Sequence, residues 1–506
     1  MAAIVAIMPF SAAVEEVSAL VETPVVEIPA LMDANETALF DLINAARKDP
    51  LGVAESLGMK RTEILKNLPE LADILTNGLP ELTFNDRLYK SAKDHTADML
   101  ANNYYAYESL DGRTIDQRLN DAGYTAAASG ESLGLIFFNN FMEPGRAATQ
   151  IFETMYKDEL DPGFAGQRNI LNPDIEEGGI SFQGGIFRFG RFSFNAYMTT
   201  CDFGTKAALQ DLQLLNLINQ ARAFPKAVAV VYGETCPEDL DPEGNGMPAI
   251  AFNPELYAAA GDHATDMVKN EYVNHVSLDN RTPEMRLEEK GYVFDWMTEL
   301  IYRMPVYAIY DAESDAAPPV EQNLSCEPVS DFFKFIYQRA IWSFEKQGDR
   351  QLFAPEAVDA GVRIVSGQSS VLGDILTDNF LLSVIELAAP AVSSDPSDPD
   401  GPRLMGTVFD DVNQNGLYDA GEEISGAVVT VAADSGAGEV GFSEPFSTLV
   451  TNPAGGFSIN LAPGPYQVRV WVQDEPRQII TLETGAANKW MGIAIEGESD
   501  AKDIGD

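Results

Sequence analysis

The amino-acid sequence predicts an α+β protein with two tandem layered domains and a small all-β domain behind them. Three observations support this: a long internal repeat, helices that precede strands in each copy, and a two-residue periodicity near the C-terminus. The 506 residues suffice for about three domains of ordinary size. The predicted organisation is a candidate signal peptide and linker over 1–35, repeats over 36–203 and 207–387, a linker over 388–403 and a β-sandwich over 404–498.

The repeat recurs at a constant offset. An offset of 168 residues relates three well-separated pairs: Phe84 and Phe252, Ser109 and Ser277, and Gly123 and Gly291. Repeats of solenoid proteins are only about 20–50 residues long, so this period indicates a duplicated domain. Each copy is long enough to bury its own hydrophobic core.

Each copy starts with helices and ends with strands. Apolar residues at 3-4 spacing predict opening helices near Glu36 and Leu214, followed by amphipathic helices. The amphipathic helices are predicted over 85–102 and 253–270, and the strands over 179–182, 192–197, 361–364 and 380–384. Because strands and helices do not alternate, the pattern favours an α+β layered domain over a parallel α/β fold.

The C-terminal region changes to strand periodicity after a Pro/Ser/Asp-rich linker. Alternating apolar residues predict strands over 407–409, 428–431, 457–461 and 466–472, separated by Pro/Gly turns. Short strands with such turns are typical of a β-sandwich, here of about 100 residues.

Charge and termini limit the function classes. The formal net charge is −45, with 78 acidic and 33 basic residues, and such a surface repels nucleic acid and anionic membranes. It suits divalent cations, although solubility alone also explains it. The apolar residues 2–10 and the small residues 11–13 resemble a secretory signal without its basic region. We therefore expect a secreted, periplasmic or cell-surface protein with no transmembrane segment in its mature form.

Cysteine spacing argues against a zinc site. Cys201, Cys236 and Cys326 stand in no CxxC or comparable ligand spacing. One disulfide with one thiol left over is compatible with three cysteines, and the sequence leaves their pairing open.

The ordered motifs of the two copies carry a family resemblance. The first copy contains Asn44-Ala45-Ala46-Arg47, His95-Thr96-Ala97-Asp98-Met99, Ser109-Leu110-Asp111-Gly112-Arg113-Thr114, Arg118, Gly123-Tyr124, Gly130-Glu131-Ser132 and Gly166-Gln167-Arg168. The second contains Asn219-Gln220-Ala221-Arg222, His263-Ala264-Thr265-Asp266-Met267, His275-Val276-Ser277-Leu278-Asp279, Arg286, Gly291-Tyr292, Thr298-Glu299-Leu300 and Gly348-Asp349-Arg350. The series resembles the CAP superfamily of cysteine-rich secretory, antigen 5 and pathogenesis-related proteins, in its bacterial SCP-like form. This resemblance implies two α-β-α sandwich domains.

The resemblance also implies a cleft with two histidines and two acidic residues, which in some members holds a divalent metal. The corresponding positions are Tyr107, Glu131 and Gln167 in the first copy and His275, Glu299 and Asp349 in the second. The helix-borne acidic position has no clear match in either copy. Phenol and amide groups make the first set a poor metal site.

The second set leaves several chemical roles open. One imidazole and two carboxylates can bind a divalent ion, and His275 with Glu299 can also act as an acid–base couple. A relic polar cleft held only by hydrogen bonds is the third interpretation. His95 and His263 lie at apolar helical spacing, which favours a tie between the helix and its neighbours over a role as ligand or base.

A calcium-binding motif lies outside the repeats. Residues 411–422 match D-x-[DN]-x-[DN]-G-x5-E at every specified position. The predicted ligands are Asp411, Asn413, Asn415, Leu417 through its carbonyl, Asp419 and Glu422. With two amides in place of acids we expect a Kd of about 10⁻⁴–10⁻³ M for Ca²⁺, and an ion-free Asx-rich turn is the alternative. Strands rather than helices flank the loop, which resembles the B-type repeats and prealbumin-like modules of bacterial surface proteins.

Together these features predict a ligand- or ion-binding protein whose surviving cleft lies in the second copy. The expected partner is a small ligand, a lipid or a cell-surface component, with lipids or sterols suggested only by the family resemblance. A hydrolytic enzyme using His275 and Glu299 is one alternative, although no serine nucleophile elbow, HExxH or P-loop occurs. A structural, adhesin-like protein with inactive clefts is the other.

Overall fold

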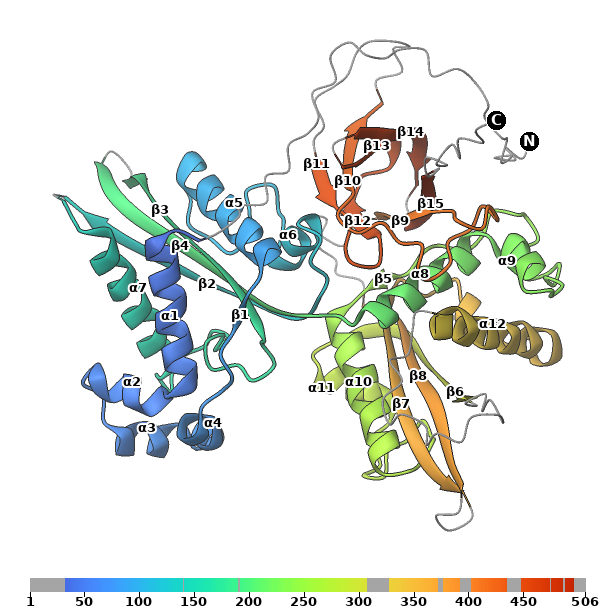
Figure 1. The fold of residues 1–506 in the computed structure, drawn as a ribbon, viewed down its shortest axis with the longest axis horizontal. Coiled ribbons are helices and arrows are strands. Elements are labelled where there is room, and N and C mark those ends of the chain that lie inside the picture. Colours follow the sequence, from blue (N-terminus) through green and yellow to red (C-terminus); the bar gives the residue numbers. More distant parts are fainter. Residues whose placement is uncertain are drawn as a thin grey trace, which may run out of the picture. The chain divides into compact units, whose positions relative to one another are not determined.

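The computed structural model describes residues 32–139, 141–189, 192–306, 327–371, 376–391, 402–434, 447–473, 475–485 and 487–495. The chain divides into two compact units, one ending at Ala207 and the other beginning at Ala208 (Figure 1). The candidate signal peptide and Cys326 lie outside the described residues, as do 392–401 of the predicted linker. Cys201 and Cys236 are free thiols.

The first unit is a three-layer α-β-α sandwich built on a four-stranded sheet of order β1-β3-β4-β2 (Figure 1). Strand β1 pairs with β3 in parallel, while β3, β4 and β2 are antiparallel. Its helices are α1 (Ala34–Lys48), α2 (Pro50–Ser56), α3 (Arg61–Asn67), α4 (Ala72–Asn77), α5 (Asp86–Asn102), α6 (Ile115–Asp121) and α7 (Pro144–Glu159). Its strands are β1 (Thr83–Phe84), β2 (Ala126–Phe138), β3 (Glu177–Phe189) and β4 (Phe192–Lys206).

Alternate residues of β4 face the two helical layers, as successive residues of any strand do. Cys201 and Phe203 pack into the core that contains α1 and α7. Ala196 and Met198 instead pack with Met99 of α5. A polar side chain at an even-numbered position of this strand therefore lies on the α5 side of the sheet.

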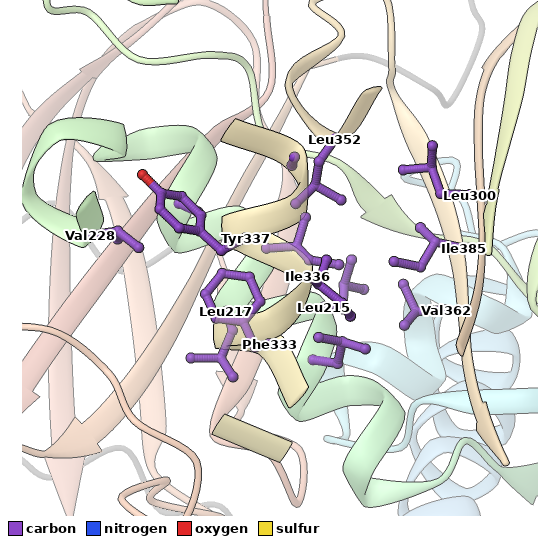
Figure 2. Close-up of a cluster of buried hydrophobic side chains, with 14 of the residues drawn as sticks. Leu215, Leu217, Val228, Leu300, Phe333, Ile336, Tyr337, Leu352, Val362 and Ile385 are labelled. Carbon is purple, nitrogen blue, oxygen red and sulfur yellow. The ribbon is translucent and has the colours of Figure 1, made fainter. Parts of the chain in front are cut away.

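The second repeat has the same sheet order, β5-β7-β8-β6. Its helices are α8 (Leu209–Ala223), α9 (Pro225–Val231), α10 (Pro254–Lys269), α11 (Pro283–Glu289) and α12 (Glu327–Gln347), and its strands are β5 (Ala251–Phe252), β6 (Phe294–Val306), β7 (Asp359–Val371) and β8 (Leu376–Pro390). Phe333 and Ile336 of α12 pack in the core to which Ile385 of β8 belongs (Figure 2). The matching topology confirms the predicted α+β class and the duplication.

The N-x-x-R motif of each copy is structural. The Arg47 guanidinium is buried and donates hydrogen bonds to the carbonyls of Pro80, Ile170, Asn172 and Ile175. Arg222 does the same with the carbonyls of Pro248, Leu352 and Ala354. Buried backbone carbonyls of irregular segments need hydrogen-bond donors. In each copy one arginine supplies them and so holds several loop segments together.

The C-terminal region forms two sheets packed face to face, of order β11-β10-β13-β14 and β12-β9-β15. The strands are β9 (Arg403–Asp410), β10 (Val428–Ala433), β11 (Ser447–Val450), β12 (Gly456–Asn460), β13 (Gly464–Val472), β14 (Glu475–Thr484) and β15 (Lys489–Ile495). Val408, Val429, Val468 and Ile493 from four of these strands share one core. The four strands predicted from alternation are present, and β11, β14 and β15 complete the sandwich.

The sandwich and the second repeat form one unit. Tyr418 and Phe409 belong to the hydrophobic core of the second repeat, and Tyr418 is fully buried. The side chain of Gln220 on α8 forms hydrogen bonds with both the N–H and the carbonyl of Tyr418, at 2.7 and 2.9 Å. Met405 and Trp490 pack separately against the segment before β5. Residues 388–390 of the predicted linker belong to β8 and Arg403 belongs to β9, and the domains on either side share a core.

Candidate functional site

The candidate site of the second repeat is centred on Glu299 of β6, whose side chain is almost completely buried. Its Oε1 lies 2.8 Å from Nδ1 of His275, and its Oε2 accepts a hydrogen bond from Nη2 of Arg286. The His275 side chain is 56% exposed. The site therefore presents an accessible imidazole that is held from behind by a buried carboxylate and guanidinium.

Arg286 positions the segment that carries the histidine. It lies on α11, which begins after the N-cap residue Thr282. Its Nη1 donates to Ser277 Oγ and Arg281 O, both at 3.1 Å, and its Nη2 donates to His275 O at 3.0 Å. Because one planar guanidinium bonds the loop and the carboxylate at once, their relative placement is fixed.

His263 of α10 lies behind this group and is buried. Its Nε2 donates to Asn274 O at 2.9 Å, so its Nδ1 accepts from Ser277 Oγ at 3.3 Å. Its Nε2 is 3.8 Å from Glu299. Burial lowers the pKa of His263. The imidazole ties the helix to the site loop, as its helical spacing favours, and it has no access to solvent.

A second carboxylate lies directly across the strand pair from Glu299. This residue is Glu386 of β8, which is the register partner of Glu299 and is fully buried. Burial, reinforced by repulsion from Glu299, raises the pKa of Glu386 well above its ordinary value. For Glu299 burial acts in the same direction, but the hydrogen bond with His275 and the charge of Arg286 outweigh it and its pKa is lowered. The opposite shifts favour the proton of the pair on Glu386 rather than on Glu299.

The first repeat repeats this arrangement without the imidazole. Glu131 of β2 accepts a hydrogen bond from Arg118 Nη2 at 2.7 Å and lies opposite Asp202 of β4. The exposed residue Tyr107 replaces His275, and its carbonyl accepts from Arg118. Burial and repulsion from Asp202 raise the pKa of Glu131 to about 9, with only the buried His95 ring, 3.9 Å away, as a neighbouring imidazole. Glu131 thus lacks the hydrogen bond from an exposed imidazole that Glu299 receives from His275.

The third predicted position behaves differently in the two copies. In the first, Gln167 donates from Nε2 to Ser129 O at 3.1 Å, which brings it to the strand that carries Glu131. In the second, Asp349 is exposed and accepts from the N–H of Gln351, whose side chain accepts from Tyr302 OH.

Tyr302 lies three residues after Glu299 on the same strand and therefore on the opposite face of the sheet. Tyr302 packs in the core with α12. Burial raises the pKa of its hydroxyl, and the charge of Asp349 raises that pKa further. The structure brings His275 and Glu299 together and places Asp349 near Tyr302. A shared ligand set of His275, Glu299 and Asp349 does not form.

Sequence reasoning missed the role of the arginines and the second carboxylates. Arg118 and Arg286 were visible as a repeated motif position, and their burial next to an acid is a structural result. The signal for Glu386 is an acidic residue between apolar neighbours, two positions after the predicted strand over 380–384. Such a residue is buried only when it is paired or protonated.

A profile of the cysteine-rich secretory protein family, CAP, matches residues 40–203 and 215–323, which together make up more than half of the chain. The chain belongs to the CAP family. The match to the second CAP domain stops before α12, whereas the structure continues the same fold through β8.

Solved structures with detectable similarity are distant. An extracellular protein with an SCP domain from Bacillus anthracis is 20% identical, with 34% of this chain and 40% of that chain covered and a TM-score of 0.19. An outer surface protein of Borrelia burgdorferi is 20% identical over 29% of this chain and 97% of its own, with a TM-score of 0.18. The major pilin subunit of Bacillus cereus is 13% identical over 27% and 55%, with a TM-score of 0.15. No curated protein matches the chain.

The predicted calcium loop follows β9 and leads to an isolated bridge between Phe409 and Glu423. The Asp411 carboxylate accepts the N–H groups of Asn415 and Gly416 at 3.0 and 2.8 Å, and Gly416 has a φ of 74°. The positive φ is one that glycine adopts without strain. The loop is therefore closed around its first acidic residue.

The other polar side chains of the loop converge. Asn413 and Asn415 each donate from Nδ2 to Asp419 Oδ2 at 2.8 Å. Rotating each side-chain amide by about 180° would place its Oδ1, in place of its Nδ2, beside Asp419 Oδ2. Glu422 accepts the N–H groups of Val412 and Asp419 at 3.1 Å. The described part of the chain contains no group of three His, Cys, Asp or Glu side chains placed for a metal, so an ion in this loop needs the amide and carbonyl oxygens as well.

The three histidines of this CAP protein should titrate differently. The hydrogen bond with Glu299 raises the pKa of His275, whereas burial lowers those of His263 and His95, the latter to about 4. In a histidine-selective NMR titration we expect one resonance to titrate above pH 6.5 and two below it, that of His95 near pH 4. Glu299→Gln should lower the pKa of His275 toward its ordinary value and lower that of His263 further, since the Glu299 charge raises both, and should leave His95 unchanged. Three overlapping titrations near pH 6.5 would contradict the assigned contacts.

The same contacts predict a pH-dependent stability. Because the folded pKa of His275 lies above its unfolded value of 6.5, its ion pair stabilises the domain fully below that pH and is lost as pH rises through the folded pKa. His275→Ala should therefore remove stability at pH 6 and change little at pH 9, as measured by urea unfolding. Tyr107→Ala, at the twin position, should show no such dependence.

Proposed function

We propose that the chain is an exported CAP protein that binds a small ligand or ion at the cleft of its second CAP domain. The observation that carries this proposal is the exposed His275 ring bonded through Nδ1 to the buried Glu299. The N-terminal apolar segment supports export, and no helix among the described residues is both long and apolar enough to cross a bilayer.

The geometry suits recognition of a polar group. With Nδ1 donating to Glu299, Nε2 is the nitrogen available to a ligand. A carboxylate behind a histidine is also the arrangement that orients metal-binding imidazoles. The raised pKa of His275 keeps part of the ring protonated near neutral pH, which favours an anionic group. As pH rises, the neutral ring becomes able to coordinate a divalent ion that brings its remaining ligands with it.

The hydrolytic alternative rests on the same pair. A histidine oriented by a carboxylate is a general base, and Glu299 gives His275 that orientation. Among the described residues no hydroxyl or thiol is bonded to His275, so the base would have to act directly on water. Ester and peptide substrates incubated with the full chain and with His275→Ala would reveal this activity as turnover in the first alone.

Calorimetry on the full chain tests the binding proposal. Zn²⁺, Ca²⁺, Mg²⁺, acetate and phosphate should be titrated in an Asp411→Ala background, which removes the predicted calcium loop from the signal. Binding that disappears in His275→Ala and persists in Tyr107→Ala supports the second cleft. No binding of any probe would favour a structural protein with inactive clefts.

We also propose that Ca²⁺ occupies the loop 411–422 and stabilises the C-terminal sandwich against the second CAP domain. The loop contains Tyr418, and Ala420 N donates to Ser330 Oγ of α12 at 3.2 Å. Loop closure is therefore coupled to the contact between the two domains, which an ion on Asp411 and Glu422 would reinforce.

Calcium should accordingly raise the melting temperature of the chain. At a concentration about tenfold above Kd the gain is about 1.4 kcal/mol, and each kcal/mol corresponds to about 2–4 °C for a unit of this size. Asp411→Ala should abolish the shift, as read by differential scanning calorimetry with and without chelator. Asp434→Ala, which removes an acidic side chain from the same sandwich but outside the loop, should retain the calcium-dependent shift. An intact chain whose melting does not respond to calcium would contradict the proposal.

A further inference from the structure

One end of the sheet in the first CAP domain carries a cluster of phenylalanines. Phe137 of β2 contacts Phe187 of β3 and Phe194 of β4, with ring centroids 5.6 Å apart in both pairs. Phe192 contacts Phe194 at 6.5 Å. Phe137 is 44% exposed and Phe192 is 56% exposed. The cluster is therefore partly packed and partly open to solvent.

Further apolar side chains surround this end. Phe141, in the segment after β2, is 85% exposed, and Ile186 of β3 is 62% exposed. Ile186 precedes Phe187 and so faces the other side of the hairpin. We call Phe137, Phe141, Ile186, Arg188 and Phe192 the aromatic tip.

The tip lies beyond the helix that covers this face of the sheet. Helix α5 ends at Asn102, and the Asn103 side chain then bonds the N–H and the carbonyl of Arg188. Figure 1 shows the ends of β2, β3 and β4 extending past α5. Exposed aromatic residues at a protruding end are costly unless something covers them, because monomeric proteins rarely expose contiguous apolar patches.

The charge of the tip is opposite to that of the chain. No Asp or Glu occurs over 178–201, in a sequence with 78 acidic residues, and this stretch contains Arg188 and Arg191. Arg188 is exposed, and its guanidinium has no carboxylate partner among the described residues. The tip is thus a local basic and apolar surface on a protein of net charge −45.

The second CAP domain shows that the fold does not require these residues. Its hairpin turns between Val371 and Leu376, as the first turns between Phe189 and Phe192. The segments equivalent by strand register are 183–196, with four Phe, two Arg and no acidic residue, and 365–380, with one Phe, two Asp and no basic residue. The same topology forms with both, so folding alone does not explain the aromatic tip.

We propose that the aromatic tip docks the protein on a phospholipid bilayer. The apolar side chains would enter the interfacial region, and Arg188 would bind headgroup phosphate, which guanidinium groups bind well. Phe192 and Ile186 project from opposite sides of one hairpin. Such a convex tip fits immersion in a fluid interface better than a flat protein contact. Since acidic surface repels anionic lipid, the hairpin, which has no Asp or Glu over 178–201, is the part of this end that approaches a membrane with the least repulsion.

Vesicle flotation of the full chain tests this proposal. We expect co-flotation with phosphatidylcholine vesicles at about 0.15 M salt, reduced about tenfold or more by Phe137→Ser with Phe192→Ser, since each exposed ring contributes apolar burial. Leu278→Ser with Val293→Ser, two exposed positions of the second CAP domain, is the matched control and should float like the native chain. Thermal melting confirms that both double variants fold.

A tryptophan reporter gives a second readout. Phe192→Trp should show a blue-shifted emission with vesicles that is quenched by brominated lipid, and Val293→Trp should show neither. Absence of flotation, or equal loss in the control variant, would overturn the proposal. Binding that needs phosphatidylglycerol and disappears at high salt would also overturn it, because attraction by the arginines alone would then suffice. Self-association without vesicles that is lost in the double Ser variant would assign the tip to a second copy of the chain instead.

Discussion

Arg286→Ala is expected to destabilise the second CAP domain by about 3–5 kcal/mol, the usual cost of leaving one partner of a buried ion pair alone. Arg286 and Glu299 are both almost completely buried. The substitution also removes the hydrogen bonds to Ser277 and to the carbonyls of His275 and Arg281. Glu299 would then have to be protonated or to draw in water, and the loop carrying His275 would lose its anchor.

Urea unfolding followed by tryptophan fluorescence measures this loss. All four tryptophans, Trp296, Trp342, Trp471 and Trp490, lie in the unit that begins at Ala208, so the signal reports that unit. Arg286→Lys should recover little, because an ammonium cannot reproduce the planar set of donors. The control is Arg281→Ala, which breaks only exposed ion pairs and should cost less than about 1 kcal/mol. Similar costs for Arg281→Ala and Arg286→Ala would contradict the assigned role.

Tyr418→Ala should separate the unfolding of the C-terminal sandwich from that of the second CAP domain. The Tyr418 ring is fully buried in the shared core and packs edge-on against Phe409 at 5.8 Å. Truncating a buried aromatic costs about 3–5 kcal/mol. The truncation would leave a cavity at the contact between the two domains. Most of the lost free energy should therefore be interaction energy between the domains rather than stability within either one.

Hydrogen exchange measured by mass spectrometry distinguishes coupling from general destabilisation. In the native chain, β10 and α12 should open together; in Tyr418→Ala the sandwich strands should exchange first while α12 keeps its protection. The matched control is Phe457→Ala, a truncation in the sandwich's own core, which should destabilise without separating the two. If Tyr418→Ala and Phe457→Ala give the same exchange pattern, the shared core does not couple the domains.

Much of the fold could be predicted from local pattern. Helical spacing marked α1, α5, α8 and α10, and two-residue alternation marked four strands of the sandwich, since these periodicities follow from backbone geometry. Strand β14 was not predicted because most of its side chains are exposed, and β15 was not predicted because its buried residues Trp490, Ile493 and Ile495 do not alternate strictly. The family was also evident, since its motifs are short and occur in order in both copies.

The sequence by itself determined the duplication, the α+β class, the CAP membership and the two positions His275 and Glu299, because each depends on residues near one another in the chain. Tertiary structure alone decided which carboxylates meet. Glu386 reaches Glu299 across a strand pair, and Asp349 instead accepts the N–H of Gln351. It also decided that the sandwich shares a core with the second CAP domain. Contacts between residues so far apart in sequence depend on strand register and on the packing of whole layers, which no local periodicity records.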